Sequence, residues 1–196
     1  MIKHPEQRVG IFIDVQNMYY SARNLYNAKV NFSNIIKIAT GNRKMVRAIA
    51  YVVKTTSREE KPFHEALSHA GIELREKDLQ EFFGGEKKAD WDVGLSVDAI
   101  RISALLDTII IVSGDGDYCP LVEYLKNQGR QVEIVAFRET ASSKLVEMAD
   151  DFIDLSQDKK NFLIGSRPAP ARRAPSRAPA RRTTRRPAPS RPAPKK

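Results

Sequence analysis

The chain has 196 residues and a mass of 22.1 kDa, a length that favours one ordinary domain with some additional chain over two full domains. Lys and Arg number 33 against 24 Asp and Glu, so the formal net charge is +9 at pH 7. The single cysteine, Cys119, excludes a disulfide framework within the chain and a cysteine-rich zinc site. Because no apolar run approaches the ~18 residues of a membrane span and the start of the chain lacks a signal-peptide pattern, we expect a soluble cytoplasmic protein with no membrane partner.

The excess positive charge lies in the last part of the chain. Residues 166–196 contain nine Arg, two Lys and no acid, a charge of +11 that leaves −2 on residues 1–165. The same segment holds eight of the eleven prolines, and alanine is its only aliphatic residue, so it cannot bury enough apolar surface to fold. We therefore expect one folded domain over 1–165 and a disordered Arg/Pro/Ala-rich tail over 166–196.

Short apolar runs alternate with helical patterns along residues 1–165. In chain order, the patterns predict a strand over 9–13, helices over 17–28 and 32–39, a strand over 45–53, a helix over 57–70, a strand over 72–74, a helix over 92–106, a strand over 108–112, a helix over 120–128, a strand over 131–137, a helix over 142–149 and a strand over 152–155. Ser33 is a candidate cap for the second helix. The alternation predicts an α/β fold, a three-layer α/β/α sandwich around a largely parallel sheet.

Acidic residues follow two of the predicted strands. Asp14 comes directly after the strand over 9–13, and Asp115 and Asp117 follow the strand over 108–112 within the sequence SGDGD. Ligand sites of open α/β sheets lie beyond the carboxyl ends of strands. Asp and Gly are also ordinary turn residues, but two acidic strand ends favour a site over turn composition alone.

The helix predicted over 92–106 carries a further acid in an apolar stripe, because Asp98 falls between Ile102 and Leu105 on its surface. A second apolar stripe runs along another side: Val93, Val97, Ile100 and Ala104. Two stripes predict a helix that is well buried. Since a buried Asp needs a counter-charge or a metal, Asp98 either belongs to the acidic site or pairs with Arg101; we favour the site.

Five aspartates converge if these elements pack as predicted: Asp14, Asp92, Asp98, Asp115 and Asp117. Such a cluster of like charges is hard to hold together without cations. Carboxylate ligands suit Mg²⁺ or Mn²⁺, which also engage phosphate oxygens, whereas zinc prefers His or Cys. We therefore expect Mg²⁺ or Mn²⁺ at the site and no small-molecule cofactor.

Three blocks of the sequence resemble a known family. They are IDVQN at 13–17, KKADWDVGLSVDAI at 87–100 and IIIVSGDGDYCPLVEYLKNQGRQVEIV at 109–135. Together they resemble the NYN domain of the LabA-like group, within the PIN-like nuclease superfamily, and the resemblance covers residues 9 to 155. The spacing of SGDGDY is similar to the PIN-type TxDxDF pattern, with Ser113 for Thr and Tyr118 for Phe.

The resemblance implies an α/β/α sandwich with an acidic pocket that binds Mg²⁺ or Mn²⁺ and cleaves RNA phosphodiester bonds. The acids that it implies for catalysis and metal binding are Asp14, Asp92, Asp115 and Asp117. Asp98 matches the position of a further PIN-type acid. The resemblance also implies supporting roles, in which Asn17 hydrogen-bonds near Asp14 and Ser113 orients the SGDGD turn.

Several residues are candidates for binding the RNA, which we expect to be single-stranded. Lys87 and Lys88 precede Asp92 and either contact phosphates or form a solvated basic loop. Trp91 and Tyr118 either stack on a base or pack in the core. The tail is expected to bind RNA or another polyanion, with a solubility segment or an arm for anionic lipids or proteins as the alternatives. Its candidate RNA-binding residues are Arg172, Arg173, Arg181, Arg182, Arg185 and Arg186.

Two functional hypotheses follow from the sequence. The first is a ribonuclease that depends on Mg²⁺ or Mn²⁺, and the second is a nonenzymatic RNA-binding or regulatory module on the same fold. Haloacid-dehalogenase-type phosphatases need a second acid where this chain has Gln16, and Toprim domains begin with a glutamate where it has Asp14, so both classes fit poorly. The intact set of acids favours the enzyme, and the sequence leaves a homo-oligomer open.

Overall fold

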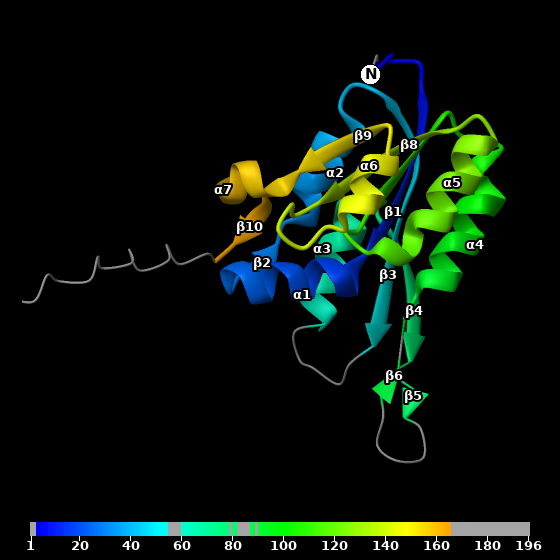
Figure 1. Cartoon of the computed structure of the whole chain (residues 1–196). Helices are drawn as coiled ribbons and strands as arrows, with labels where there is room; N and C mark the ends of the chain where they lie inside the picture. Colours follow the sequence, from blue (N-terminus) through cyan, green and yellow to red (C-terminus); the bar gives the residue numbers. More distant parts are fainter. Residues whose placement is uncertain (1–2, 55–59, 79, 82–86, 89, 166–196) are drawn as a thin grey trace, which may run out of the picture.

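The computed structural model describes residues 3–54, 60–78, 80–81, 87–88 and 90–165, and the tail predicted over 166–196 lies outside them. Within these residues a six-stranded sheet has the order β4-β3-β1-β7-β8-β9 (Figure 1), and every neighbouring pair in it is parallel. The elements are β1 (Arg8–Asp14), α1 (Val15–Tyr26), β2 (Lys29–Val30), α2 (Phe32–Thr40), β3 (Lys44–Lys54), α3 (Glu60–His69), β4 (Glu73–Asp78), β5 (Gln80–Glu81), β6 (Lys87–Lys88), α4 (Asp92–Ser103), β7 (Thr108–Val112), η1 (Gly116–Tyr118), α5 (Cys119–Asn127), β8 (Gln131–Ala136), α6 (Ser143–Met148), β9 (Asp151–Asp154), η2 (Leu155–Asp158), α7 (Lys159–Phe162) and β10 (Leu163–Ile164). None of the helices described is both long and apolar enough to cross a bilayer.

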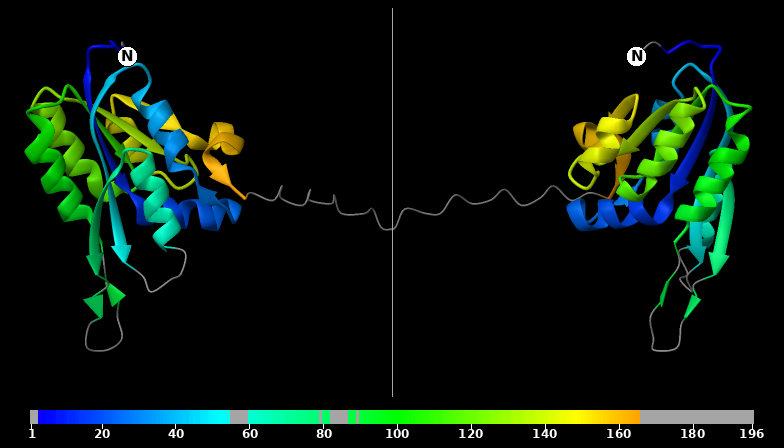
Figure 2. Two further views of the ribbon diagram at one scale, coloured as in Figure 1. Left: turned by 180° about the vertical axis from the view of Figure 1, so that it is seen from behind. Right: turned by 45° about the vertical axis from the view of Figure 1, so that its right-hand side comes forward.

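Helices cover both faces of the sheet, which gives three layers (Figures 1 and 2). In β1, Val9, Ile11 and Ile13 join a buried cluster with residues of α1, α2 and α3. Phe12 joins the cluster on the other face, with residues of α4, α5 and α6. Successive side chains of a strand point to opposite faces, so a strand covered on both faces appears in the sequence as a continuous apolar run. The structure confirms the predicted α/β/α sandwich.

Most predicted elements are present, with bounds that differ by a few residues, and the strand over 108–112 matches β7. The prediction lacked the short pairs β2–β10 and β5–β6 and the segment η2–α7. Strands of two residues are too short to show alternation. Ser33 was wrong as the cap of α2: it lies inside the helix, and Asn31 is the cap because its side chain accepts the Asn34 N–H at 3.2 Å.

α4 is buried on one side only, which corrects the prediction of two buried stripes. Its inner side, with Leu95, Ala99 and Ile102, packs in the core. The outer stripe lies at the surface, where Val93 is 74% exposed and Val97 is 44% exposed. A helix in the outer layer of a sandwich packs against the sheet with one side. Of the other predicted stripe only Ile102 is buried, because Leu105 lies beyond the end of the helix and is 60% exposed.

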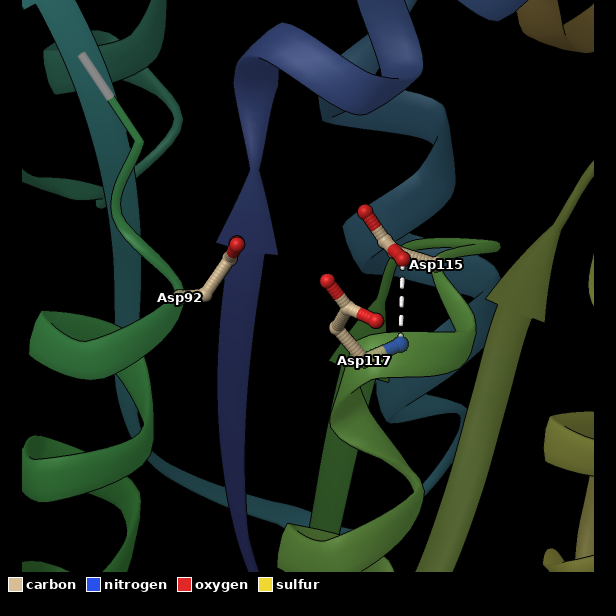
Figure 3. A group of neighbouring side chains, drawn as sticks. All are labelled: Asp92, Asp115 and Asp117. Carbon is tan, nitrogen blue, oxygen red and sulfur yellow. Dashed lines mark hydrogen bonds between the residues drawn. The ribbon is translucent and has the colours of Figure 1, made fainter. Parts of the chain in front are cut away.

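The register of the sheet brings the two acidic strand ends together. β1 pairs with β7 from Val9↔Thr108 to Ile13↔Val112. Asp14 and Ser113 therefore follow neighbouring parallel strands at the same carboxyl edge. Asp92 is the first residue of α4 and also lies at this edge. Figure 3 shows it opposite the turn that follows β7.

Candidate metal centre

Three carboxylates converge at the carboxyl edge of the sheet (Figure 3). Asp92, Asp115 and Asp117 each place one oxygen within 4.8 Å of the others. Asp92 begins α4, whereas Asp115 and Asp117 lie in the turn after β7. The Asp115 carboxylate caps η1 by accepting a hydrogen bond from the Asp117 N–H at 3.0 Å. The fold thus brings three of the predicted acids into one group, which we call the acid cluster.

Polar side chains hold the turn after β7 in place. Ser113 is buried, and its Oγ accepts a hydrogen bond from the Asp115 N–H at 3.2 Å. Asn17, on the first turn of α1, accepts a hydrogen bond at its Oδ1 from the Gly114 N–H at 3.1 Å. These two bonds fix the backbone that carries Asp115 and Asp117 against the start of α1.

Both glycines of the SGDGD turn lie close to the chain that follows β8. A Cβ on Gly114 would lie 3.0 Å from the Ala141 Cα, and a Cβ on Gly116 would lie 3.0 Å from the Ser142 Oγ. The Gly114 carbonyl also accepts a hydrogen bond from the Ser142 N–H at 2.9 Å. A side chain at either glycine would therefore crowd the segment after β8, against which the acidic turn packs.

Asp14 is buried beside the acid cluster without being one of its three members. Its Oδ1 accepts a hydrogen bond from the Asn17 N–H at 3.0 Å and caps α1. Its Oδ2 accepts a hydrogen bond from the Tyr118 hydroxyl at 3.2 Å. Burial raises the pKa of the Asp14 carboxyl above its usual value, and the charges of Asp92 and Asp115 raise this pKa further. A positive charge at this edge of the sheet would therefore stabilise the ionised form of Asp14.

Tyr118 links Asp14 to the acid cluster, a role that the sequence analysis did not predict. Its hydroxyl lies 3.2 Å from the Asp14 Oδ2 and 3.0 Å from the Asp92 Oδ1, and its one proton is donated to one of these two carboxylates at a time. Burial and these two charges raise the pKa of Tyr118 well above its usual range, which keeps the hydroxyl protonated. The ring is fully buried, so stacking of Tyr118 on a base is ruled out. The PIN-type pattern has Phe at this position. The presence of Tyr instead of Phe was the feature of the sequence that could have indicated a role for this hydroxyl.

The structure gives Asp98 other partners and does not bring it into the acid cluster. The Tyr51 hydroxyl donates to its Oδ2 at 3.1 Å. The Arg101 guanidinium lies 3.4 Å from its Oδ1, and the Arg75 Nε lies 3.8 Å from its Oδ2. Of the two alternatives left by the sequence, this geometry supports the structural pair, because two cations and a hydroxyl already compensate the charge.

The predicted RNA-binding residues fall mostly outside the described side chains. Lys87 and Lys88 form β6, which pairs with β5, but their side chains and the six tail arginines lie outside the described part of the chain. Trp91 is described, and its Nε1 donates to the Val52 carbonyl at 3.0 Å. Its ring lies 5.3 Å from the Tyr51 ring, centroid to centroid. These contacts support packing for Trp91, the second of the roles predicted for it.

The acid cluster has the chemistry of a site for a hard divalent cation. In the part of the chain that the structure describes, no Lys or Arg forms an ion pair with Asp14, Asp92, Asp115 or Asp117. Burial raises the pKa of Asp92 as well, and the charges of Asp115, Asp90 and Asp117 raise it further. Carboxylate oxygens without nitrogen or sulfur donors suit Mg²⁺ or Mn²⁺ better than zinc. The residues present therefore fit the expected ion.

The fold and the acid cluster define a class of protein, a parallel α/β/α domain with a carboxylate site at the carboxyl edge of its sheet. The model of the NYN domain matches residues 8–156, and the chain belongs to the NYN domain family. The resemblance drawn from the three sequence blocks is thereby confirmed, and the PIN-like superfamily fits the fold.

Two relatives show how far the similarity extends. The chain is 27% identical over 183 residues to the low amplitude and bright protein LabA of Synechococcus elongatus, covering 86% of this chain and 94% of LabA. The crystal structure of a protein of unknown function from Vibrio parahaemolyticus is 32% identical, with a TM-score of 0.75, and the match covers 84% of this chain and 100% of that one. Neither protein's name states a chemical activity.

Proposed function

We propose that the chain is a ribonuclease that hydrolyses RNA phosphodiester bonds with Mg²⁺ or Mn²⁺. The observation that carries the proposal is the convergence of Asp92, Asp115 and Asp117 within 4.8 Å of one another at a sheet edge. Ligand sites of such sheets lie at this edge. Membership of the NYN domain family supports the same activity, because NYN domains are typically nucleases.

In this proposal, the three carboxylates of the acid cluster hold the cation, and Asp14 adds negative charge beside it. When bound, the cation supplies positive charge to phosphate oxygens and makes water more acidic. Tyr118 keeps its proton and hydrogen-bonds Asp14 and Asp92, so both carboxylates stay in place. Asn17 and Ser113 hold the turn that carries Asp115. Without a cation, the four carboxylates repel a phosphodiester, so a bound metal favours the entry of a phosphate into the acid cluster.

The tail and the lysines of β6 have a part in the same proposal. Residues 166–196 carry eleven cationic side chains and no acid, a composition that attracts any polyanion. We assign them, together with Lys87 and Lys88, to binding of single-stranded RNA outside the metal centre. The division into a domain over 1–165 and a tail, and the cytoplasmic location, stay predictions from the sequence.

Cleavage of end-labelled single-stranded RNA by the purified full chain tests the proposal. We expect cleavage with Mn²⁺ and none with EDTA, and Asp115→Asn should lower the rate by orders of magnitude. Glu123→Gln is the matched control, since it removes an exposed carboxylate on α5 and should leave the rate unchanged. Equal cleavage by Asp115→Asn and wild type contradicts the site. RNA binding without cleavage under any of these conditions would instead support the nonenzymatic module.

A further inference from the structure

α1 presents two tyrosine rings at the surface. Tyr19 is 42% exposed and Tyr20 is 50% exposed, whereas Val15, Met18 and Ala22 form the buried side of the same helix. The two rings meet edge to face, with centroids 5.4 Å apart and an interplanar angle of 71°. Exposed aromatic rings leave apolar surface in water, which a stacking partner would cover.

Arg23 completes this group and supplies its positive charge. Its Nη1 donates to the Tyr19 hydroxyl at 3.2 Å, and its guanidinium carbon lies 5.8 Å from the centre of the Tyr19 ring. Among the residues that the structure describes, Arg23 forms no ion pair with a carboxylate. The guanidinium has five N–H donors, so most of its capacity to bind an anion is available. Tyr19, Tyr20 and Arg23 form what we call the α1 surface.

The α1 surface lies close to the acid cluster because both depend on the first turns of α1. This helix begins directly after Asp14, and Asn17 holds the Gly114 N–H of the acidic turn. Tyr20 is three residues after Asn17, so the two side chains are neighbours on the helix surface. At 1.5 Å per residue, Tyr20 is about 9 Å along the helix axis from Asp14. Figures 1 and 2 show α1 at the end of the domain to which the arrowheads of β3 and β4 point.

We propose that Tyr19, Tyr20 and Arg23 form a stacking surface that holds unpaired bases of a single-stranded nucleic acid next to the acid cluster. This inference rests on the proposed function and extends it by naming where the substrate lies. Stacking on aromatic rings is tolerant of base identity and does not need a cation. It therefore supplies attraction beside carboxylates that repel phosphate. Bases in a duplex are already stacked and paired, so the surface favours single strands.

Other described aromatic residues are less suited to this role. Trp91 and Tyr118, the candidates from the sequence, are held in the packing around Val52 and Asp14. Tyr124 is 43% exposed but lies on α5, on the opposite face of the sheet from α1. Exposed tyrosines and arginine are also enriched in protein interfaces, so a protein partner for the α1 surface is the competing outcome. Proximity to the acid cluster favours nucleic acid.

Binding of a fluorescent 12-nucleotide oligo(A) to the full chain in EDTA tests the inference without cleavage. Tyr19→Ala/Tyr20→Ala should weaken binding about five- to 150-fold for each base that is no longer stacked. Tyr20→Trp should bind the oligonucleotide as tightly as the wild type or more tightly. Tyr124→Ala, which removes another exposed tyrosine, is the matched control. Binding of a duplex RNA should be the same for the tyrosine variants as for the wild type. Arg23→Ala should reduce the slope of log affinity against log salt by about 0.7.

The results separate this inference from the proposed function. Wild-type affinity in the double variant, or an equal loss for duplex RNA or for Tyr124→Ala, overturns the inference. A change of oligomeric state in the double variant, with RNA binding unchanged, overturns it in favour of a protein interface. Metal-dependent cleavage with an unchanged KM in the double variant would leave the nuclease intact without the α1 surface. Weakened binding in a protein that cleaves nothing would support the surface and reject the nuclease.

Discussion

Replacing Tyr118 with phenylalanine tests whether one hydroxyl holds two of the acids in place. The ring is fully buried, and phenylalanine keeps its volume and packing, so the substitution removes the hydroxyl alone. The Asp92 carboxylate loses a donor at 3.0 Å, and the Asp14 carboxylate loses one at 3.2 Å. Both carboxylates then lack the donor between them, and their charges are less compensated.

The expected loss follows from the number of protons involved. One hydroxyl proton serves one carboxylate at a time, so the substitution removes one hydrogen bond to a charged group, which contributes about 1.5–3 kcal/mol. We expect the free energy of unfolding of the metal-free protein to fall by about 2 kcal/mol. For a domain of this size, that corresponds to about 4–8 °C in melting temperature. The hydroxyl also lowers the pKa of Asp14 and Asp92, so its loss should move Mn²⁺ binding to higher pH.

Calorimetric melts in EDTA measure this loss directly. Tyr124→Phe is the control, since its ring is 43% exposed and a surface change of this kind should alter stability by less than about 0.5 kcal/mol. Mn²⁺ titrations of both variants at several pH values give the second readout. If Tyr118→Phe melts within about one degree of the wild type and binds Mn²⁺ with the same pH dependence, the hydroxyl does not hold the carboxylates.

Three further changes test other parts of the account. Asp14→Asn keeps the acceptor that caps α1 and should melt at a higher temperature than the wild type in EDTA. The pKa of Asp14 is raised in the folded protein, so the stability contributed by its protonated form is lost as pH rises through that pKa. The difference in melting temperature should therefore grow from about pH 4 upward, and a difference that does not change with pH contradicts this prediction. Asp98→Ala leaves the Tyr51 hydroxyl without its carboxylate and should lower the free energy of unfolding by about 1–3 kcal/mol, while a smaller stabilisation by Mn²⁺ would place Asp98 in the metal site. Truncation after Gly165 should flatten the salt dependence of RNA binding by about 3–4 units if half the tail's cations contact phosphates, and an unchanged slope gives the tail another role.

The sheet was predictable from the sequence because strands that are buried on both faces have continuous apolar runs. β1 and β7 contain continuous apolar runs; β1 ends at Asp14, and Ser113 directly follows β7. The short pairs β2–β10 and β5–β6 leave no such trace, since two residues show no period. The outer stripe of α4 has an apolar pattern that wrongly predicts burial. Its apolar residues are as regular as those of a buried side, and only the arrangement of layers shows that Val93 is exposed.

The acids of the site were predictable for a similar reason, and their contacts were not. Chain position alone puts Asp14 and Asp115 at or after the ends of predicted strands, and the parallel strands of one sheet end at one edge. Asp98 receives a hydrogen bond from Tyr51, which is distant in the chain and reaches it only in the folded protein. The hydroxyl of Tyr118 likewise acts on Asp14 across 104 residues. Local patterns indicate which residues are charged but not which distant group compensates them.

The proposed function rests on the claim that RNA cleavage requires a divalent cation on the acid cluster. Bound Mn²⁺, counted by electron paramagnetic resonance, and the initial rate of RNA cleavage are to be measured in the same samples across a Mn²⁺ titration. We expect the rate to follow the bound fraction, and Asp92→Asn to shift both curves together to higher Mn²⁺. Cleavage without bound Mn²⁺, or full occupancy without cleavage of any RNA, would contradict the claim.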